Sequence, residues 1–369
     1  MKLQLLSSRE SSRSLTCSYL VILSLACGEN PVDVTPDASS SSSSSSDSSS
    51  SESNAGDSSG GEGSSSGTDA CNEPAPAVTE DVLLATPTGD IWGTWTAPAG
   101  CAPFPTVLFH TGSGPTDRDG NTPLLPGRND GHLQLAEFLR DHGVASVRFD
   151  KRGVGASIDA LGDPVALRLD DYVDDLNGWI ALLRGQPELV GPLTVLGHSE
   201  GALIATLTAE RTDVDALILV AGAGRPIGDV LRTQLAAKIT DLDLLARANE
   251  IITELEMGNT VDDVPPELAN LFDPGVQPYL ISSMAYDPAA ELAGVTVPTG
   301  IIVGTADTQV AVSEGELLAA ARPDAALWVI ENMTHTFKDA GRGQDAAYSD
   351  PDIAFAAGFT DAVTELVAR

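Results

Sequence analysis

The sequence predicts an α/β fold with a mostly parallel central sheet flanked by helices. Short apolar runs rich in β-branched residues recur along residues 74–369, and segments of helical length separate them. Two of these helical segments end at a glycine, as helices commonly do. The alternation stops over residues 225–293, where the pattern is helical, and then resumes. This stretch is therefore an insertion between two late strands, and we expect it to form a lid over the site.

The predicted elements follow this alternation in chain order. Two strands joined by Pro87-Thr88-Gly89-Asp90 form an opening hairpin, and the remaining strands are short and apolar. We expect strands at 82–85, 91–96, 106–110, 144–150, 193–196, 216–220, 299–303 and 326–330. We expect helices at 133–142, 171–184, 202–210, 230–239, 244–255 and 353–367.

Part of the chain has a composition that cannot build a core. Residues 38–67 are almost entirely Ser, Gly, Asp and Glu, so they offer no apolar surface whose burial would offset the entropy of ordering. We expect a flexible tether over residues 28–73. The rest, residues 74–369, is long enough for one large α/β domain with an insertion.

The first 27 residues predict export. Basic residues precede an apolar run at 19–26, which is too short to span a bilayer comfortably and suits the core of a signal peptide. Cys27 follows directly and leads into the tether, which resembles a bacterial lipoprotein, in which this cysteine is lipidated. Ser24 stands where such proteins usually have leucine, so secretion with cleavage nearby stays open. We expect a cell-envelope lipoprotein or a secreted protein, with a lipid anchor as its one membrane contact.

The cysteine count agrees with export. If Cys17 leaves with the signal and Cys27 is acylated, Cys71 and Cys101 remain as a pair. In an oxidising compartment such a pair indicates a disulfide, which would add roughly 3–4 kcal/mol to the free energy of unfolding on the chain-entropy model. Two free thiols are the alternative.

Charge and histidine spacing exclude two classes of partner. The formal net charge is −33, so we expect no nucleic-acid partner, because phosphate binding needs clustered Lys and Arg. The five histidines are scattered without the spacing of metal ligands, so we expect no metal site. The sequence makes no prediction of oligomeric state.

One pentapeptide predicts a nucleophile. Gly197-His198-Ser199-Glu200-Gly201 lies where an apolar strand ends and a helix begins, which is the setting of the nucleophile elbow. A strained turn there lifts the serine hydroxyl clear of the sheet, and strand and helix approach so closely that only glycine fits on either side. Ser199 is thus the expected nucleophile of a serine hydrolase. A tight turn without catalysis is the alternative.

A serine hydroxyl needs a base, and the base needs an acid to orient it. His335 is the one histidine late enough for the chain order Ser, acid, His, and it follows the last strand in a polar loop. Asp307 follows strand 299–303 through a loop that contains glycine, so we expect it to be the acid. Asp287 and Asp339 are weaker candidates. An ordinary loop histidine and a surface aspartate are the alternatives.

Two backbone N–H groups are candidates for binding the oxyanion. One belongs to Glu200, directly after the nucleophile. The other belongs to Ser113, in a loop whose glycines allow close approach to a substrate carbonyl, although a plain Gly-Pro turn is the alternative.

The remaining charged residues and histidines near these motifs have expected structural roles. We expect six charged residues to brace the loop by ion pairs rather than to do chemistry: Asp117, Arg118, Asp119, Asp150, Lys151 and Arg152. His110 is expected to shape the mouth of the site. His132 and His142 bracket a helix and are expected at the surface or as caps.

Several runs together resemble one bacterial group of α/β-hydrolases, known broadly as esterase-like or peptidase-like hydrolases. The runs are Gly-Ser-Gly-Pro-Thr-Asp-Arg-Asp-Gly-Asn from residue 112, Arg-Phe-Asp-Lys-Arg-Gly from residue 148, the Gly-His-Ser-Glu-Gly elbow, Asp-Thr-Gln-Val from residue 307, and Met-Thr-His from residue 333. The resemblance covers residue 82 to the end. Ala202 departs from it, since the group often has a third glycine there. It implies the α/β-hydrolase fold and hydrolysis without a cofactor, but not the substrate.

The expected activity is hydrolysis of a small-molecule carboxylic ester through an acyl-enzyme, because an alkoxide leaves more easily than an amide nitrogen. A serine peptidase or amidase with the same triad is one alternative. A non-catalytic binding protein of the cell envelope on a hydrolase fold is the other.

Overall fold

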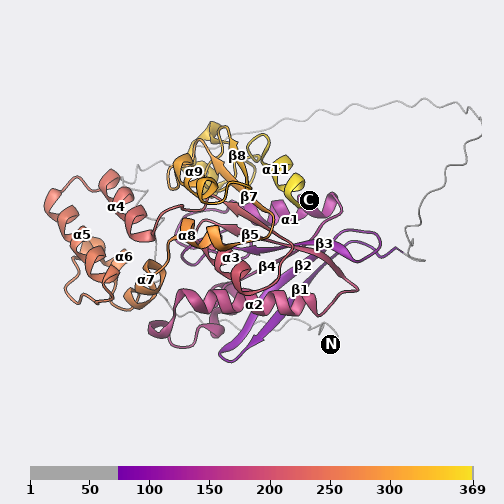
Figure 1. Ribbon diagram of the computed structural model, residues 1–369, viewed down its shortest axis with the longest axis horizontal. Coiled ribbons are helices and arrows are strands. Elements are labelled where there is room, and N and C mark those ends of the chain that lie inside the picture. The colour runs from indigo at the N-terminus through magenta and orange to yellow at the C-terminus, as the bar shows by residue number, and fades with distance from the viewer. Residues whose placement is uncertain (1–73, 368–369) are drawn as a thin grey trace, which may run out of the picture.

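The computed structural model describes residues 74–367, and its strands form one sheet in the order β1-β2-β4-β3-β5-β6-β7-β8 (Figure 1). The hairpin β1–β2 is antiparallel and joins the sheet by an antiparallel pairing of β2 with β4, whereas all later pairings are parallel. The predicted α/β class with a mostly parallel sheet is confirmed. The predicted signal peptide and tether, with Cys27 and Cys71, lie outside the described residues.

The strand bounds lie close to those predicted from sequence. They are β1 (Val78–Thr86), β2 (Gly89–Ala97), β3 (Phe104–His110), β4 (Ala145–Phe149), β5 (Val190–His198), β6 (Ala216–Val220), β7 (Thr299–Gly304) and β8 (Ala326–Ile330). The central parallel strands are buried on both faces, so they consist of continuous apolar runs rather than alternating ones.

Helices cover both faces of the sheet (Figure 1). One layer packs on a core that includes Phe109, Ile218 and Ile302, and it consists of α1 (Gly131–Asp141) and α11 (Phe359–Val367). The other face carries α2 (Leu169–Arg184), α3 (Glu200–Arg211) and α9 (Val312–Ala321). Because successive strand residues point to opposite faces, neighbours such as Ile218 and Leu219 belong to different cores.

The inserted helices lie between β6 and β7 in the chain, and most of them gather at the left of Figure 1. They are α4 (Ile227–Lys238), α5 (Leu242–Glu256), α6 (Ala269–Phe272), α7 (Gln277–Met284) and α8 (Pro288–Gly294). The Asp241 carboxylate caps α5 by accepting from the N–H groups of Asp243 and Leu244. Asp287 caps α8 in the same way, so this weaker acid candidate has a structural role.

The helices differ from the prediction in two places. The last helix begins at Phe359 rather than at 353, because Lys338 pairs with Phe355 and the Ala356 N–H donates to the Phe337 carbonyl, which holds this segment extended. Helix α9 was not predicted, since its sequence lacks a polar face. The remaining short helices are η2 (Gly155–Leu161), η3 (Pro164–Ala166), η4 (Pro266–Leu268), η5 (Ala340–Arg342) and α10 (Gln344–Ser349).

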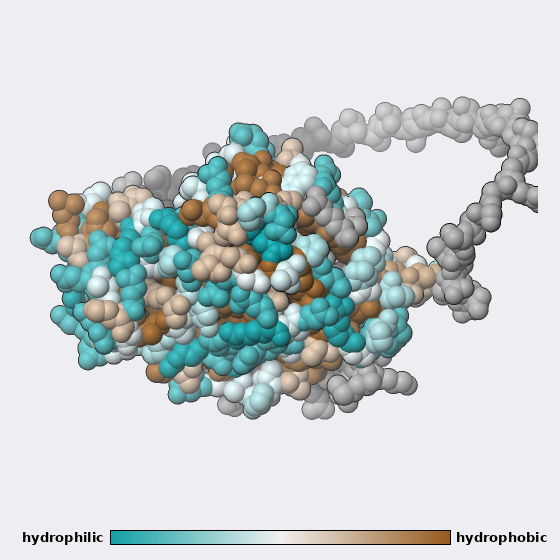
Figure 2. Space-filling view, in the orientation of Figure 1, coloured by the Kyte–Doolittle hydropathy of each residue, from teal (hydrophilic) through white to brown (hydrophobic). Residues whose placement is uncertain are grey.

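The surface is hydrophilic over much of the face in Figure 2, with hydrophobic residues gathered near the edge strand β8. Leu327 and Val329 of this strand and Leu317 of α9 are exposed. Within residues 74–367, no helix is both long and apolar enough to cross a membrane.

Candidate active site

Ser199 lies in a strained turn between β5 and α3. Its φ of 57° and ψ of −120° are unfavourable for a residue with a side chain. Its N–H donates to the Val220 carbonyl at 2.9 Å, and its own carbonyl accepts from the Ala202 N–H at 2.9 Å, so the surrounding backbone holds the turn. The hydroxyl is thereby presented at the N-terminus of α3, where developing negative charge is favoured.

The glycines on either side of the turn are required by close packing, as the sequence predicts. A Cβ on Gly197 would lie 2.2 Å from the Gly201 carbonyl oxygen, and a Cβ on Gly201 would lie 2.5 Å from the His110 carbonyl oxygen. Both distances are far below van der Waals contact, so strand and helix meet backbone to backbone.

Asp307 and His335 are joined by a hydrogen bond. Asp307 Oδ2 lies 2.7 Å from His335 Nδ1, and both side chains are shielded from solvent. The other carboxylate oxygen, Oδ1, accepts from the N–H groups of Gln309 at 2.8 Å and Val310 at 3.0 Å. With both oxygens occupied, the carboxylate can turn only by breaking bonds. It favours the tautomer with a proton on Nδ1, which leaves Nε2 as an acceptor.

The loop that carries His335 is fixed to the acid loop and to the elbow. The Met333 carbonyl accepts from the Ala306 N–H at 3.1 Å, which ties it to the acid loop. The ring of His198, the residue before Ser199, bonds through Nε2 to the His335 carbonyl at 2.9 Å. The structure thus brings the histidine loop against the elbow. Within residues 74–367 the Ser199 hydroxyl forms no hydrogen bond with His335.

The Gly-rich loop after β3 lies against the nucleophile. A Cβ on Gly112 would lie 3.1 Å from the Cβ of Ser199. The Thr116 hydroxyl donates to the Ser113 carbonyl at 3.0 Å and fixes the next turn. Among the described residues, the N–H groups of Ser113 and Glu200 donate to no acceptor. Both residues line the hollow that contains Ser199, so two free donors flank the nucleophile.

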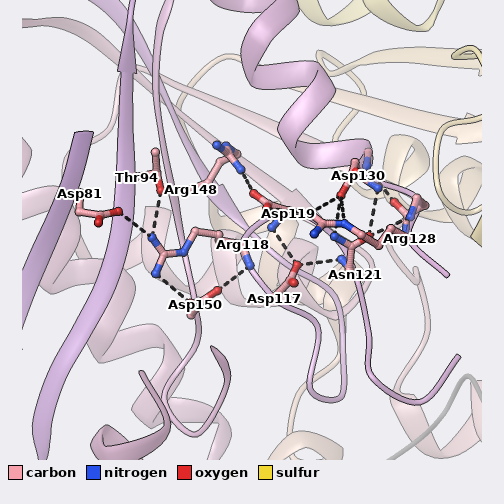
Figure 3. A network of polar contacts seen from close by, with 12 residues as sticks. Asp81, Thr94, Asp117, Arg118, Asp119, Asn121, Arg128, Asp130, Arg148 and Asp150 are labelled. Carbon is pink, nitrogen blue, oxygen red and sulfur yellow. Dashed lines mark hydrogen bonds and ion pairs between the residues drawn. The ribbon is translucent and has the colours of Figure 1, made fainter. Parts of the chain in front are cut away.

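Charged side chains in and around this loop form a network of ion pairs and hydrogen bonds (Figure 3). Arg118 pairs with Asp150 at 2.9 Å and donates to the Thr94 hydroxyl at 2.9 Å. Asp117 Oδ1 accepts from the N–H groups of Asp119 and Asn121, each at 2.9 Å. Two further pairs join Asp119 to Arg148 and Asp175 to Arg152. The predicted ion pairs are present for Arg118, Asp119, Asp150 and Arg152, whereas Asp117 accepts from backbone N–H groups and forms no ion pair within the described residues. Lys151 is different, because its ammonium donates to the Gly112 carbonyl.

His132 is expected at the surface or as a helix cap, and this prediction is wrong, since the N-cap of α1 is Asp130. Only 1% of His132 is exposed, because the start of α1 packs its ring onto Phe337, with ring centroids 5.6 Å apart, and near His198 at 5.4 Å. His110 is also fully buried. Burial lowers the pKa of both His110 and His132 to about 3, so both rings are neutral at pH 7. His142 is exposed at the end of α1, as expected.

The hollow beside Ser199 is shared by the central domain and the inserted helices. Its apolar wall consists of Leu169, Leu203, Ala223, Ile227, Val230, Pro288 and Val310. Arg225, Gln234 and Gln309 supply polar groups. Arg225 is held by Glu314, whose carboxylate also accepts from the Gly224 N–H at 3.0 Å. No sequence pattern marks Glu314, a buried acid in a helix rich in alanine. A second hollow, lined by Lys151, Tyr172 and Tyr279, shares Glu200 with the first.

The architecture is similar to that of solved hydrolases. The α/β hydrolase GrgF from Penicillium sp. sh18 superposes with a TM-score of 0.52 at 16% identity, covering 79% of this chain and 98% of GrgF. Est1E from Butyrivibrio proteoclasticus, solved with ferulic acid bound, gives 0.50 at 16% identity over 78% of this chain and 96% of Est1E. The chain has the α/β-hydrolase fold. At these identities the likeness concerns the fold alone.

Two sequence similarities also point to hydrolases. Residues 130–263 match the profile of the family described as "Serine aminopeptidase, S33". Esterase EstD of Thermotoga maritima is 28% identical over 247 residues, which are 66% of this chain and 57% of EstD. The match therefore spans less than two thirds of that relative. Among residues 74–367 no group of three or more His, Cys, Asp or Glu side chains is placed to hold a metal ion.

Proposed function

We propose that this protein is a serine esterase in which Ser199 is the nucleophile, His335 the general base and Asp307 the acid that orients it. The observation that carries the proposal is the 2.7 Å hydrogen bond between Asp307 and His335, in a loop packed against the strained elbow at Ser199. A structural aspartate–histidine pair would not require a serine with positive φ beside it.

The reaction follows from this arrangement. His335 Nε2 takes the proton of the Ser199 hydroxyl as the oxygen attacks the ester carbonyl, and Asp307 stabilises the imidazolium that forms. The negative charge on the carbonyl oxygen is met by the free N–H groups of Ser113 and Glu200. The imidazolium then protonates the departing alkoxide, which leaves as an alcohol. Water, deprotonated by the same imidazole, then attacks the acyl-enzyme. The imidazolium returns that proton to the Ser199 oxygen as its bond to the acyl carbon breaks, which releases the carboxylic acid and restores the neutral imidazole.

The hollow favours a substrate with an apolar group. Seven of its lining residues are aliphatic, alanine or proline, and they come from both the central domain and the inserted helices. Burial of an aliphatic chain there would contribute about 0.8 kcal/mol per methylene. The inserted helices act as a lid in this proposal, since they supply Ile227 and Val230 to the wall. Small-molecule esters with an aliphatic part are therefore the expected substrates.

A serine peptidase or amidase is the second candidate. It is favoured by the match to the aminopeptidase family profile and by the Glu200 carboxylate, which lines the hollow where a substrate ammonium would sit. We favour the ester, because Glu200 already interacts electrostatically with the Lys151 ammonium and because EstD is an esterase. Turnover of p-nitrophenyl butyrate should exceed that of aminoacyl p-nitroanilides. Faster amide than ester turnover would reverse the assignment.

A binding protein that has lost catalysis is the remaining alternative. The decisive comparison is p-nitrophenyl ester hydrolysis by wild type, Ser199→Ala and His335→Ala, with His142→Ala as a matched control because that histidine is exposed. We expect the first two variants to lose at least about a thousandfold in kcat and the control to keep its rate. Equal rates in wild type and Ser199→Ala would eliminate the proposed mechanism.

Export is proposed from the sequence, with Cys27 as the lipidated residue. Cells that express the full chain should incorporate labelled palmitate into the protein, and Cys27→Ser should abolish incorporation whereas Cys17→Ser should not. Secretion without a lipid anchor would give no label in any of the three. Cys101 is disulfide-bonded, and we propose Cys71 as its partner.

A further inference from the structure

Lys151 is the one cation of the expected bracing set that pairs with no carboxylate among the described residues. It follows β4 and Asp150, only 1% of it is exposed, and its ammonium donates a hydrogen bond to the Gly112 carbonyl. Its neighbours Asp150 and Arg152 both form ion pairs. Within the described residues Lys151 has no carboxylate at ion-pair distance. Burying an ammonium against a peptide carbonyl is costly, so the contact calls for an explanation beyond bracing.

The carbonyl that Lys151 binds belongs to the peptide group whose other end is the Ser113 N–H. A trans peptide is planar, and its C=O and N–H point in opposite directions. A group that fixes the direction of the Gly112 carbonyl therefore fixes the direction of the Ser113 N–H. That N–H has no acceptor within the described residues, and Ser113 lines the hollow with Ser199.

Lys151 also interacts with the side chain of Glu200, the residue whose backbone N–H is the other proposed oxyanion donor. The Glu200 carboxylate interacts with Lys151 electrostatically, and the ammonium lies 5.4 Å from the centroid of the Tyr172 ring. Burial lowers the pKa of Lys151 to about 8, and Glu200 opposes that shift, so the side chain is mainly charged at pH 7. A cation on a carbonyl oxygen also polarises the peptide and strengthens its N–H as a donor.

We propose that Lys151 is a positioning residue for oxyanion binding, which holds the Gly112 carbonyl and thereby aims the Ser113 N–H at the carbonyl oxygen of the substrate. The inference rests on the proposed function. Lys151 touches neither the substrate nor Ser199 in this account. Its effect is confined to the step at which charge develops on oxygen, so ground-state binding should change little.

The test compares Lys151→Met with wild type in ester kinetics and in affinity for an alkylboronic acid, which forms a tetrahedral adduct on the nucleophile. We expect kcat to fall about tenfold to a hundredfold, KM to change less than twofold, and boronate affinity to fall by a factor similar to that of kcat. The matched control is Lys338→Met. Lys338 is also buried, but its ammonium bonds Gln134 and Pro351, so its loss should lower Tm and leave boronate affinity unchanged.

Further measurements distinguish a failure of this proposal from a failure of the proposed function on which it rests. Labelling of Ser199 by a fluorophosphonate should persist in K151M. If folded wild-type protein is not labelled, that result contradicts the proposed function and not the role of Lys151. If K151M does not fold, Lys151→Gln replaces it, as the amide can still donate but carries no charge. Added methylammonium should restore part of kcat to Lys151→Ala. Wild-type kcat and wild-type boronate affinity in K151M would overturn the proposal. If K151Q has to replace K151M, the proposal is overturned when K151Q has wild-type kcat and boronate affinity and methylammonium does not restore kcat to K151A.

Discussion

The Asp307 carboxylate holds His335 through one oxygen and is itself held through the other by two backbone N–H groups. Because of this arrangement, a substitution can test the proposed orienting role of Asp307 while the bonds to the two backbone N–H groups are kept. In Asp307→Asn, the amide oxygen can keep the two backbone donors while the NH₂ group faces His335 Nδ1. The imidazole would then take the wrong tautomer for a general base.

We therefore expect Asp307→Asn to lower kcat by about three to four orders of magnitude while Tm changes little. Asp339→Asn is the control, because Asp339 accepts from the Gly341 N–H outside the site. The measurement is kcat for ester hydrolysis at pH 7 in wild type and the two variants. A loss of less than about tenfold in Asp307→Asn would mean that another group orients His335.

The packing behind the elbow makes a prediction about stability. A Cβ on Gly222 would lie 2.6 Å from the Cβ of Ala202, the residue that departs from the third glycine of the resembling hydrolases. Gly222→Ala should lower the free energy of unfolding by about 1–3 kcal/mol, because the core there is already filled. In Ala202→Gly/Gly222→Ala the clash disappears. Urea unfolding of the single and double variants should give a favourable coupling of at least about 1 kcal/mol, whereas strictly additive effects would refute the clash.

The buried histidines predict how stability depends on pH. Folding lowers the pKa of His132 from 6.5 to about 3, so between these values the unfolded chain binds more protons. The free energy of unfolding should thus fall as the pH drops below about 6.5, by up to about 1.4 kcal/mol per pH unit from this group. His132→Phe keeps the stacking on Phe337 and removes the titration.

The comparison of wild type with His132→Phe isolates that contribution from other groups. Unfolding in urea at pH 7 and pH 5 should show a smaller loss of stability in the variant. Parallel stability curves for the two proteins would show that the His132 ring is not held neutral in the folded state.

The salt bridge at the start of the insertion predicts an effect on substrate binding. Glu314 is buried and accepts from Arg225 and from the Gly224 N–H, where the chain leaves β6 for the inserted helices. Glu314→Gln keeps the shape but loses the charge, so Arg225 and the wall of the hollow should become less ordered. We expect KM for p-nitrophenyl butyrate to rise several-fold with a smaller change in kcat. Arg247→Gln, which breaks the exposed pair with Glu250, is the control.

Much of the fold follows from local pattern. The buried parallel strands are continuous apolar runs, and the elbow is marked by glycines that backbone contact requires. Chain order predicts that Asp307 and His335 act as a pair, and the structure joins them by a hydrogen bond. These features are predictable because each depends on residue types at fixed spacing near a strand end.

The features that sequence missed depend on partners far along the chain. The charge pattern predicts a bracing ion pair for Lys151, but its partner is a backbone carbonyl 39 residues away, which no side-chain pattern marks. His132 is buried because Phe337 packs over it. The segment before α11 is extended because strand-like bonds to residues 337–339 override its helical pattern. In each case a tertiary contact overrode a local preference.

The central claim is that the Ser199 hydroxyl becomes a nucleophile through His335. Mass spectrometry of the protein after treatment with a fluorophosphonate tests it most directly. The account predicts a single covalent adduct on the peptide that contains Ser199, at least about a hundredfold slower labelling in His335→Ala, and none in Ser199→Ala. An unlabelled, folded wild-type protein, or an adduct on a different serine, would contradict it.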